Sequence, residues 1–232
     1  MAIFDRFKSD ENSEMSFIDH LEVLRGTIVR SLFSILIAFV VLFIYRDWIM
    51  DHIIMGPLYP DFITYKAFCD LSHYLHLGDS LCMPPVKVTL QSTTFGGQFL
   101  SAISMAFIGA IIVAFPFIFW QFWSFVKPAL KENELKNTRF MIFFVSFFFF
   151  LGAAFGFFVL GPFTFNFLAG FQLGTRGAVT TIPTFADYID NLTNLILGCG
   201  IAFEMPVIMF LLTKIGIVTP KFLRSVRKYA CL

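Results

Sequence analysis

Four long apolar segments constrain the fold of this chain more than any other feature. They lie at about 27–45, 99–126, 140–162 and 191–213, and each approaches or exceeds the roughly 20 residues that an α-helix needs to cross a bilayer. Backbone N–H and C=O groups find no water in hydrocarbon, so such segments cross it as helices. Because 57% of the residues are hydrophobic and 14% are charged, we predict an all-α, polytopic membrane helix bundle with four transmembrane helices.

The segments between the spans predict short amphipathic helices and structured loops. Ser16 and Asp19 form a helix N-cap pattern, and apolar residues then recur at helical spacing. A mixed polarity and several prolines indicate a structured loop after the first span. The predicted segments outside the spans are an N-terminal amphipathic segment 1–26, loops 46–98, 127–139 and 163–190, and a basic C-terminal segment 214–232.

The distribution of Lys and Arg predicts the orientation of the chain. Four basic residues precede or open the first span, four lie in 127–139 and five lie in 214–228, whereas the longer loops 46–98 and 163–190 hold three and one. By the positive-inside rule, both termini and the 127–139 loop are expected in the cytoplasm, and the other two loops are expected to be exoplasmic. The net charge is +1 and no basic domain is present, so nucleic-acid binding is not expected.

Glu204 lies in the middle of the last predicted span, roughly 15 to 18 Å from either end of the helix. A carboxyl group at this depth costs several kcal/mol unless it is neutral, paired or hydrated, so a functional role is expected. The alternative is a protonated Glu that donates to a backbone carbonyl beside a kink at Pro206. A proton-translocating role would require further acids or histidines along a path, and the predicted spans offer none.

The 127–139 loop contains two carboxylates, Glu132 and Glu134, between two spans with aromatic flanks. A carboxylate can accept paired hydrogen bonds from an arginine guanidinium. Lys131 and Lys136 lie in the same loop, and on residue types alone a solvated charged surface is the favoured interpretation. Binding of an arginine ligand is the functional alternative.

Cys69 and Cys82 lie in the same predicted loop, together with His73 and His76. These four side chains are of the types that bind zinc. Because the loop is predicted to face outward, where thiols oxidise, we expect a disulfide or two free thiols rather than a metal site. No catalytic or phosphate-binding motif occurs in the chain, so neither an enzyme nor a cofactor is expected.

Two patterns predict how the spans pack and where they end. Gly152 and Gly156 have the spacing of a GxxxG-like helix contact. Trp120 and Trp123 are typical of the membrane interface at the end of the second span. Pro116 predicts a kink within that span.

Motifs in every predicted segment occur in the order found in one family of membrane proteins. They are SFIDHLEVLRGTIVRS before the first span, MGPL after it, FPFIFWQFWSFVKPALKENE at the end of the second, GPFTFNFL after the third, and FEMPVIMFLLTKIGIVTPKFLRSVRKYA in and after the fourth. Together they resemble TatC, the membrane receptor subunit of the twin-arginine protein translocase.

This resemblance implies a receptor and core subunit of a plasma (inner) membrane translocase, not an enzyme. Such a subunit would bind the twin-arginine signal peptides of folded precursor proteins at the cytoplasmic face. It would assemble in the lipid bilayer as a homo-oligomer with single-span partners of the TatA or TatB type. The proton-motive force would drive export.

The resemblance also implies roles for individual residues. Glu134 matches the loop glutamate that the family uses to contact the arginines, and Glu132, Glu22 and Phe125 are expected beside it. Glu204 matches a polar residue associated with partner-helix contacts. Gln121 is assigned with it, and the prolines at family positions are Pro57, Pro116, Pro128 and Pro206.

Two departures from the family limit these expectations. Val23 occupies a position where the family has Glu, and Glu22 lies one residue earlier, about 100° around the helix. The family has six spans, and this chain ends where the fifth would begin. The alternatives are a proton-coupled transporter of small solutes that uses Glu204, which would predict internal repeats, and a nonfunctional truncated homologue.

Overall fold

The computed structural model describes residues 17–59, 61–76, 78, 82, 89–126, 138–171 and 182–214. Regular structure in these ranges is helical, apart from one isolated bridge between Gln91 and Thr184. Four helical segments are long and apolar enough to cross a membrane: Leu21–Ile44, Gly97–Val126, Met141–Gly170 and Phe185–Phe210. The predicted all-α membrane bundle with four spans is confirmed.

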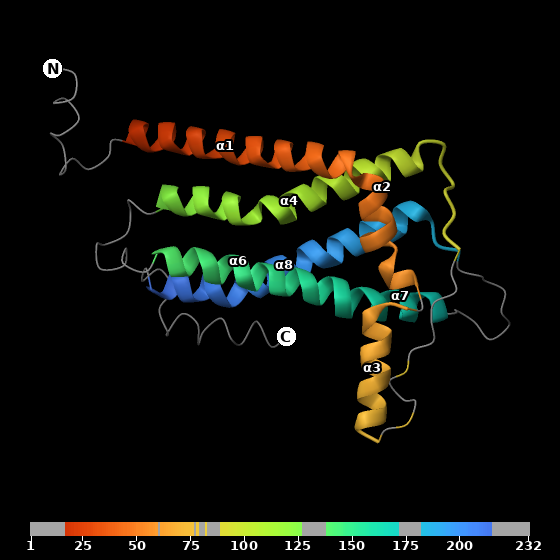
Figure 1. Cartoon of the computed structure of the whole chain (residues 1–232). Helices are drawn as coiled ribbons and strands as arrows, with labels where there is room; N and C mark the ends of the chain where they lie inside the picture. The colour runs from red at the N-terminus through yellow and green to blue at the C-terminus, as the bar shows by residue number, and fades with distance from the viewer. Residues whose placement is uncertain are drawn as a thin grey trace, which may run out of the picture.

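The spanning helices lie side by side and alternate in direction (Figure 1). They are α1 (Phe17–Ile44), α4 (Gly97–Val126), α6 (Thr138–Phe155) and α8 (Phe185–Lys214). α1 packs on α4, and α8 packs on both α4 and α6. We call the end of the bundle that holds the last turn of α4 and the first turn of α6 the loop end, because 127–137 joins them there.

The opposite end, which we call the arm end, holds the connection between α1 and α4. The chain leaves α1 through α2 (Arg46–Ile49), a π-helical turn η2 (Met50–Ile54) and a 3-10 turn η3 (Gly56–Leu58). It then enters α3 (Ile63–Tyr74), which projects sideways from the bundle, across the direction of the spans (Figure 1). We refer to α3 as the arm.

Two buried hydroxyl groups hold this connection in place, one from a spanning helix and one from within the connection. The Tyr188 hydroxyl donates to the Ile54 carbonyl at 2.6 Å, and Tyr188 is buried in α8. The Tyr65 hydroxyl donates to the carbonyl of the buried Pro57 at 2.8 Å. Burial raises the pKa of Tyr65, so the phenol is held in the neutral form that donates this bond.

The third span changes helix type near Pro162. α6 continues as a π-helical turn, η5 (Gly156–Leu160), and then as α7 (Gly161–Gly170). Proline has no N–H, so Pro162 cannot donate to the carbonyl of Phe158, four residues earlier. The Thr64 hydroxyl donates to that carbonyl instead, at 2.6 Å. The backbone group that Pro162 leaves free therefore becomes the point where the arm attaches.

Gly152 and Gly156 allow α6 to lie close against α8. A Cβ atom at Gly152 would lie 2.5 Å from the Cys199 carbonyl oxygen and 2.8 Å from the Phe203 Cβ. At Gly156 it would lie 2.8 Å from the Leu195 carbonyl oxygen. Only glycine fits at such distances, so the helix contact predicted from the GxxxG-like spacing is confirmed.

Candidate functional site

The first turns of α1 and the last turns of α4 lie at the same end of the bundle, the loop end. The two helices are antiparallel, with Phe43 packed edge-on against Phe99 at the arm end at a ring-centroid distance of 6.4 Å. Glu22 lies 21 residues before Phe43 and Phe125 lies 26 residues after Phe99, which corresponds to about 30 and 40 Å along the two helices. Glu22 is exposed and Phe125 is half-buried. Both therefore lie toward the same end of the bundle.

Glu132, Glu134 and Pro128 lie outside the described residues. The helices that flank their segment are described: α4 ends at Val126 and α6 begins at Thr138. Figure 1 shows both of these helix ends at the same end of the bundle as the start of α1. Chain connectivity thus attaches the segment with the two carboxylates to the same end of the bundle as Glu22.

Aromatic side chains follow the last turns of α4. Phe115, Phe119 and Trp123 stack in succession, with ring centroids 6.3 and 6.2 Å apart. Trp120 is exposed, as the interfacial position predicts, but Trp123 is buried in the bundle. The sequence pattern did not distinguish the two because they differ only in the direction in which their helix presents them. Gln121, between them, is half-buried.

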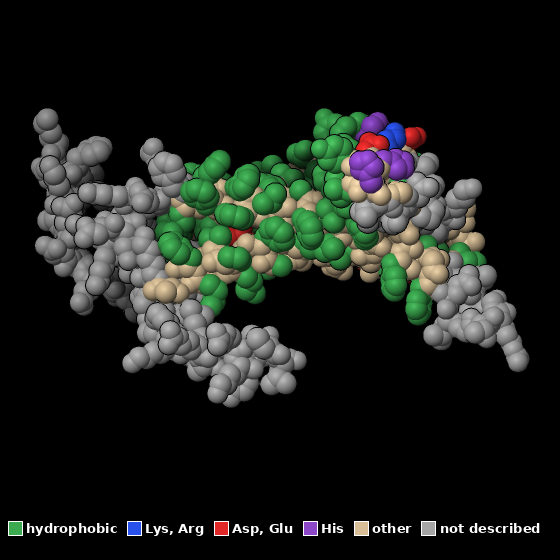
Figure 2. All heavy atoms as spheres, turned by 90° about the horizontal axis from the view of Figure 1, so that it is seen from below, with side chains coloured by type: hydrophobic (Ala, Val, Ile, Leu, Met, Phe, Trp, Pro, Cys, Tyr) green, Lys and Arg blue, Asp and Glu red, His purple; other side chains and the backbone are tan. Residues whose placement is uncertain are grey.

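Glu204 is buried within α8, with 5% of its surface exposed. The fully buried Phe149 of α6 packs one turn away, where a Cβ on Gly200 would lie 2.8 Å from the Phe149 ring. Phe149 in turn stacks on Phe115 of α4, with ring centroids 3.6 Å apart. Figure 2 shows acidic atoms surrounded by hydrophobic side chains partway along the bundle. The carboxyl group is therefore held in an aromatic environment.

Three buried polar atoms make no hydrogen bond within the described part of the protein: Glu204 Oε1, Ser146 Oγ and Trp123 Nε1. They come from α8, α6 and α4 and lie roughly 15, 12 and 5 Å from the loop-end termini of these helices, at 1.5 Å per residue. Buried polar groups are normally hydrogen-bonded, so atoms of this kind mark candidate contact positions. Sequence reasoning found Glu204 but missed Ser146, because a serine among Phe residues carries no distinctive signal.

Exposed apolar side chains lie beside Glu204 on α8. Ile201, Met205 and Ile208 are exposed, and the helical repeat puts them within about 100° of Glu204 around the helix. Pro206, the predicted kink position, lies within the continuous helix and is exposed. This side of α8 offers an apolar surface with a polar atom at its edge.

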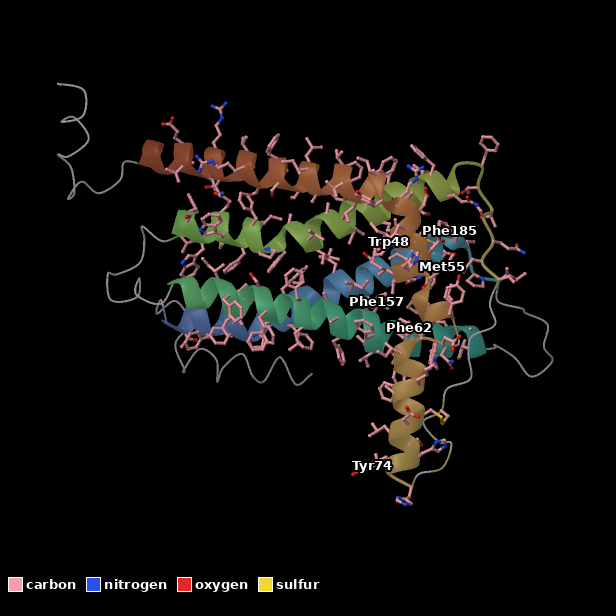
Figure 3. All side chains as sticks on the ribbon, viewed as in Figure 1. Trp48, Met55, Phe62, Tyr74, Phe157 and Phe185 are labelled. Atoms are coloured by element: carbon pink, nitrogen blue, oxygen red, sulfur yellow. A yellow bond between two sulfur atoms is a disulfide. The ribbon has the colours of Figure 1, made fainter. Side chains whose placement is uncertain are left out.

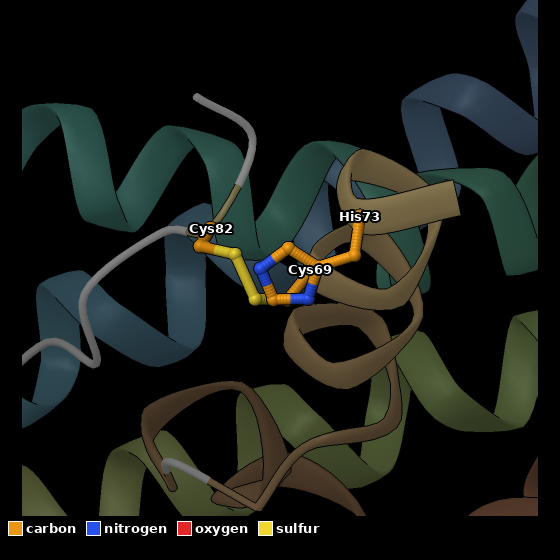
Figure 4. A group of neighbouring side chains, drawn as sticks. All are labelled: Cys69, His73 and Cys82. Atoms are coloured by element: carbon orange, nitrogen blue, oxygen red, sulfur yellow. A yellow bond between two sulfur atoms is a disulfide. The ribbon is translucent and has the colours of Figure 1, made fainter. Parts of the chain in front are cut away.

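The arm carries Cys69, and Cys82 lies in the segment that follows the arm. A disulfide joins Cys69 of α3 to Cys82, with Cα atoms 4.4 Å apart (Figure 4). His73 lies beside it, and the Cys and His ligand atoms all fall within 4.8 Å of one another. Both sulfur atoms are used in the disulfide, so neither is a thiolate that could bind a metal in this form. His76 has a positive φ of 56° and lies at the turn after α3.

Comparison with known proteins shows which family has this sequence. The family model of the Sec-independent protein translocase protein TatC matches residues 19–232. TatC of Blattabacterium sp. subsp. Periplaneta americana is 37% identical over 224 residues, covering 96% of this chain and 84% of that protein. TatC of Halalkalibacterium halodurans is 33% identical over 217 residues, covering 94% and 75%.

Solved structures agree with these relatives. A crystal structure described as the twin-arginine translocase receptor TatC in DDM matches with a TM-score of 0.69 and 28% identity, covering 90% of this chain and 82% of the other. A second crystal structure of the same receptor matches with a TM-score of 0.66 and 27% identity. The resemblance inferred from the motifs is confirmed, and the chain belongs to the TatC family of Sec-independent protein translocase proteins.

Proposed function

We propose that this subunit binds twin-arginine signal peptides at the loop end of its bundle. As a TatC-family protein it is a multi-pass membrane component of the twin-arginine translocase and a receptor rather than an enzyme. It therefore acts with other Tat proteins and with signal-bearing substrates. The observation that carries the proposal is that the exposed Glu22, the half-buried Phe125 and the two helix ends that flank 127–137 all lie at one end of the bundle.

The chemistry of this end suits an arginine pair. A guanidinium donates paired hydrogen bonds to a carboxylate, and Glu134, Glu132 and Glu22 supply three carboxylates for two arginines. Phe125 adds an aromatic surface, which attracts cations and also packs against apolar residues of a peptide. Glu22 and Val23 are both exposed, so the shift of the acid by one residue leaves its carboxylate accessible to a ligand.

Glu204 and Gln121 are assigned to contacts with a partner helix of the TatA or TatB type. Support comes from the unpartnered Glu204 Oε1 and from the exposed apolar side chains beside it on α8. A partner helix that packs on α8 would cover the apolar surface, and a hydroxyl or amide donor on it would supply the missing hydrogen bond once the buried Glu204 side chain turns outward. We also propose that the receptor works as a homo-oligomer in the inner membrane, with the N-terminus and the 127–139 and 214–232 segments in the cytoplasm, as the Lys and Arg counts predict.

The transporter alternative would use Glu204 as a proton carrier. A proton path needs more than one titratable group, and no second acid or histidine lies in the middle of a span among the described residues. Family membership also favours the translocase. The role of Glu204 is therefore better explained by assembly.

Site-specific crosslinking tests the peptide site. A signal peptide with a photoreactive group beside its arginines is mixed with the full chain in membranes, and a peptide with both arginines replaced by lysine serves as the control. We expect adducts in the first turns of α1 and in 121–139, and far fewer with the lysine peptide, since lysine cannot make the paired contact. Adducts that fall mainly on the arm end would contradict the proposed site.

Substitution at Glu204 separates peptide binding from assembly. Glu204→Ala is expected to leave the crosslinking of the peptide unchanged and to reduce co-purification of the single-span partner. Glu204→Gln keeps a hydrogen-bonding side chain of similar size and should retain more of the partner. If a Glu204 variant lost peptide binding but still co-purified with the partner, the proposed role of Glu204 in assembly would be wrong.

A further inference from the structure

The arm has two different exposed sides. Ile63, Ala67, Leu71 and Tyr74 recur at spacings of four, four and three residues and are all exposed. This spacing places them on one side of the helix. We call these four residues the apolar stripe. Large apolar side chains gathered on one exposed helix face indicate a surface that contacts something other than water.

A polar stripe follows the next side of the same helix. Lys66, Asp70 and His73 recur at spacings of four and three residues, and all three are exposed. Lys66 forms an ion pair with Asp61, with the Nζ and Oδ1 atoms 2.9 Å apart. The arm is therefore amphipathic on its exposed surface, in addition to the side that it buries against the bundle and its own loop.

The two stripes lie on adjacent sides of the arm, with mean directions roughly 90° apart at 100° per residue. Figure 3 shows Tyr74 on the side of α3 that faces back along the length of the bundle. In Figure 2, where the arm is seen end-on, Lys, acidic and His side chains gather on one part of the arm, and hydrophobic side chains lie beside them on the side toward the length of the bundle. A helix at a water–bilayer boundary has this distribution when it lies in the plane of the membrane.

The arm is also at the depth where that boundary is expected. Tyr45 and Trp48 are exposed where α1 gives way to α2, and exposed Tyr and Trp side chains are typical of the membrane interface. Figure 3 shows Trp48 and α3 at the same position along the bundle. The apolar stripe thus continues the lipid-facing surface of the spans at the level of its aromatic border.

Contacts at the base of the arm fix its angle. Thr64 is bonded to the Phe158 carbonyl, and the Phe62 ring stacks on Phe158 with centroids 5.8 Å apart. Further along, Phe68 packs edge-on against Phe163 at 5.2 Å. The disulfide closes the loop on the arm. These contacts hold α3 across the end of the bundle, and none of them uses the apolar stripe.

We propose that α3 is an interfacial helix whose apolar stripe is inserted into the bilayer leaflet at the arm end, with the polar stripe in the water. Its occupant is lipid, because the apolar stripe faces along the bundle and continues the surface that the spans present to lipid, while the charged side chains of the arm lie on the neighbouring side of the helix. The inference rests on the membrane-spanning fold and not on the proposed peptide site. The arm would hold the bundle at a fixed depth and tilt.

Spin-label accessibility tests this proposal in the full chain in phosphatidylcholine vesicles. Cys199→Ala and Cys231→Ala remove the two cysteines outside the disulfide. Nitroxides are then attached under non-reducing conditions to Leu71→Cys or to the matched position Lys66→Cys on the same helix. Oxygen partitions into lipid, whereas a nickel chelate stays in water. We expect the ratio of oxygen to nickel collisions to be several-fold higher at Leu71 than at Lys66, and to approach that of Val40→Cys on the exposed side of α1.

Two results would overturn the proposal. Equal and high nickel access at Leu71 and Lys66 would show an arm surrounded by water. Low access of both probes at Leu71 would show that a protein, such as a second copy of the chain, covers the stripe.

The unsubstituted chain provides an independent measurement. A phosphatidylcholine with a photoreactive group near its acyl ester should label residues 63–75, and absence of label there would also contradict insertion.

Discussion

At the arm end of the bundle, hydrogen bonds from Tyr188 and Thr64 join the connection between α1 and α4 to the spanning helices, and a disulfide closes a loop within that connection. At the loop end, by contrast, exposed carboxyl and aromatic side chains lie near helix termini. Tyr188, Tyr65 and Thr64 each donate to a specific backbone carbonyl at the arm end. Glu22, Trp120 and Phe122 are exposed at the loop end. The comparison indicates that one end fixes the geometry of the bundle and the other is available to a ligand.

The largest effect is expected from removing Tyr188 at the arm end. Tyr188→Ala loses a buried ring and the bond to the Ile54 carbonyl, which should lower the free energy of unfolding by about 3 kcal/mol or more. Tyr188→Phe keeps the ring and should lose about 1 to 2 kcal/mol. Unfolding in mixed micelles measures both. If a Tyr188 variant folded but lost peptide binding, the arm end would also contribute to ligand binding, and the two ends would not have separate roles.

A smaller loss is expected at the base of the arm. Thr64→Val removes the donor to the Phe158 carbonyl, which Pro162 cannot replace, and should cost about 1 to 3 kcal/mol. Thr193→Val is the matched control, since Thr193 is also buried but donates to the Ile189 carbonyl within its own helix. Hydrogen exchange in α3 should rise for Thr64→Val and not for Thr193→Val. If hydrogen exchange in α3 changed equally in the two variants, the carbonyl that Pro162 leaves free would not be the point where the arm attaches.

The smallest effect is expected at Glu22. Because this carboxylate is exposed, water screens its attraction for an arginine, and Glu22→Gln should weaken peptide binding by about 0.2 to 1 kcal/mol. Glu22→Asp keeps the charge, so its peptide affinity should be closer to that of the unsubstituted chain. Titration of a labelled signal peptide measures the change. Complete loss of binding with Glu22→Gln would show that the N-terminal acid dominates recognition.

The sequence predicted the parts of the fold that depend on composition and spacing. Apolar length located the four spans, and the spacing of Gly152 and Gly156 predicted the contact with α8. The link from Thr64 to Phe158 was missed, because it joins residues 94 positions apart and depends on a carbonyl freed by a proline. Periodicity cannot report contacts of this kind.

For the candidate site, sequence and structure contribute different parts. Motifs singled out Glu134 and Glu204, and the structure adds that Glu204 is buried while Glu22 is exposed. The burial of Trp123 could not be read from the sequence, since an interfacial and an inward-facing tryptophan look alike in an aromatic run. Which side chains face a partner depends on packing between helices, and packing is a property of the whole bundle.

The most direct test of the peptide site is a double-mutant cycle between Glu134 and the arginines of a signal peptide. Binding is measured for the full chain and for Glu134→Gln, each with the twin-arginine peptide and with its twin-lysine counterpart. If Glu134 contacts the arginines, the two changes should be non-additive, with a coupling free energy of about 1.5 kcal/mol or more. Additive losses would show that Glu134 and the arginine pair do not touch, and would contradict the proposed recognition at the loop end.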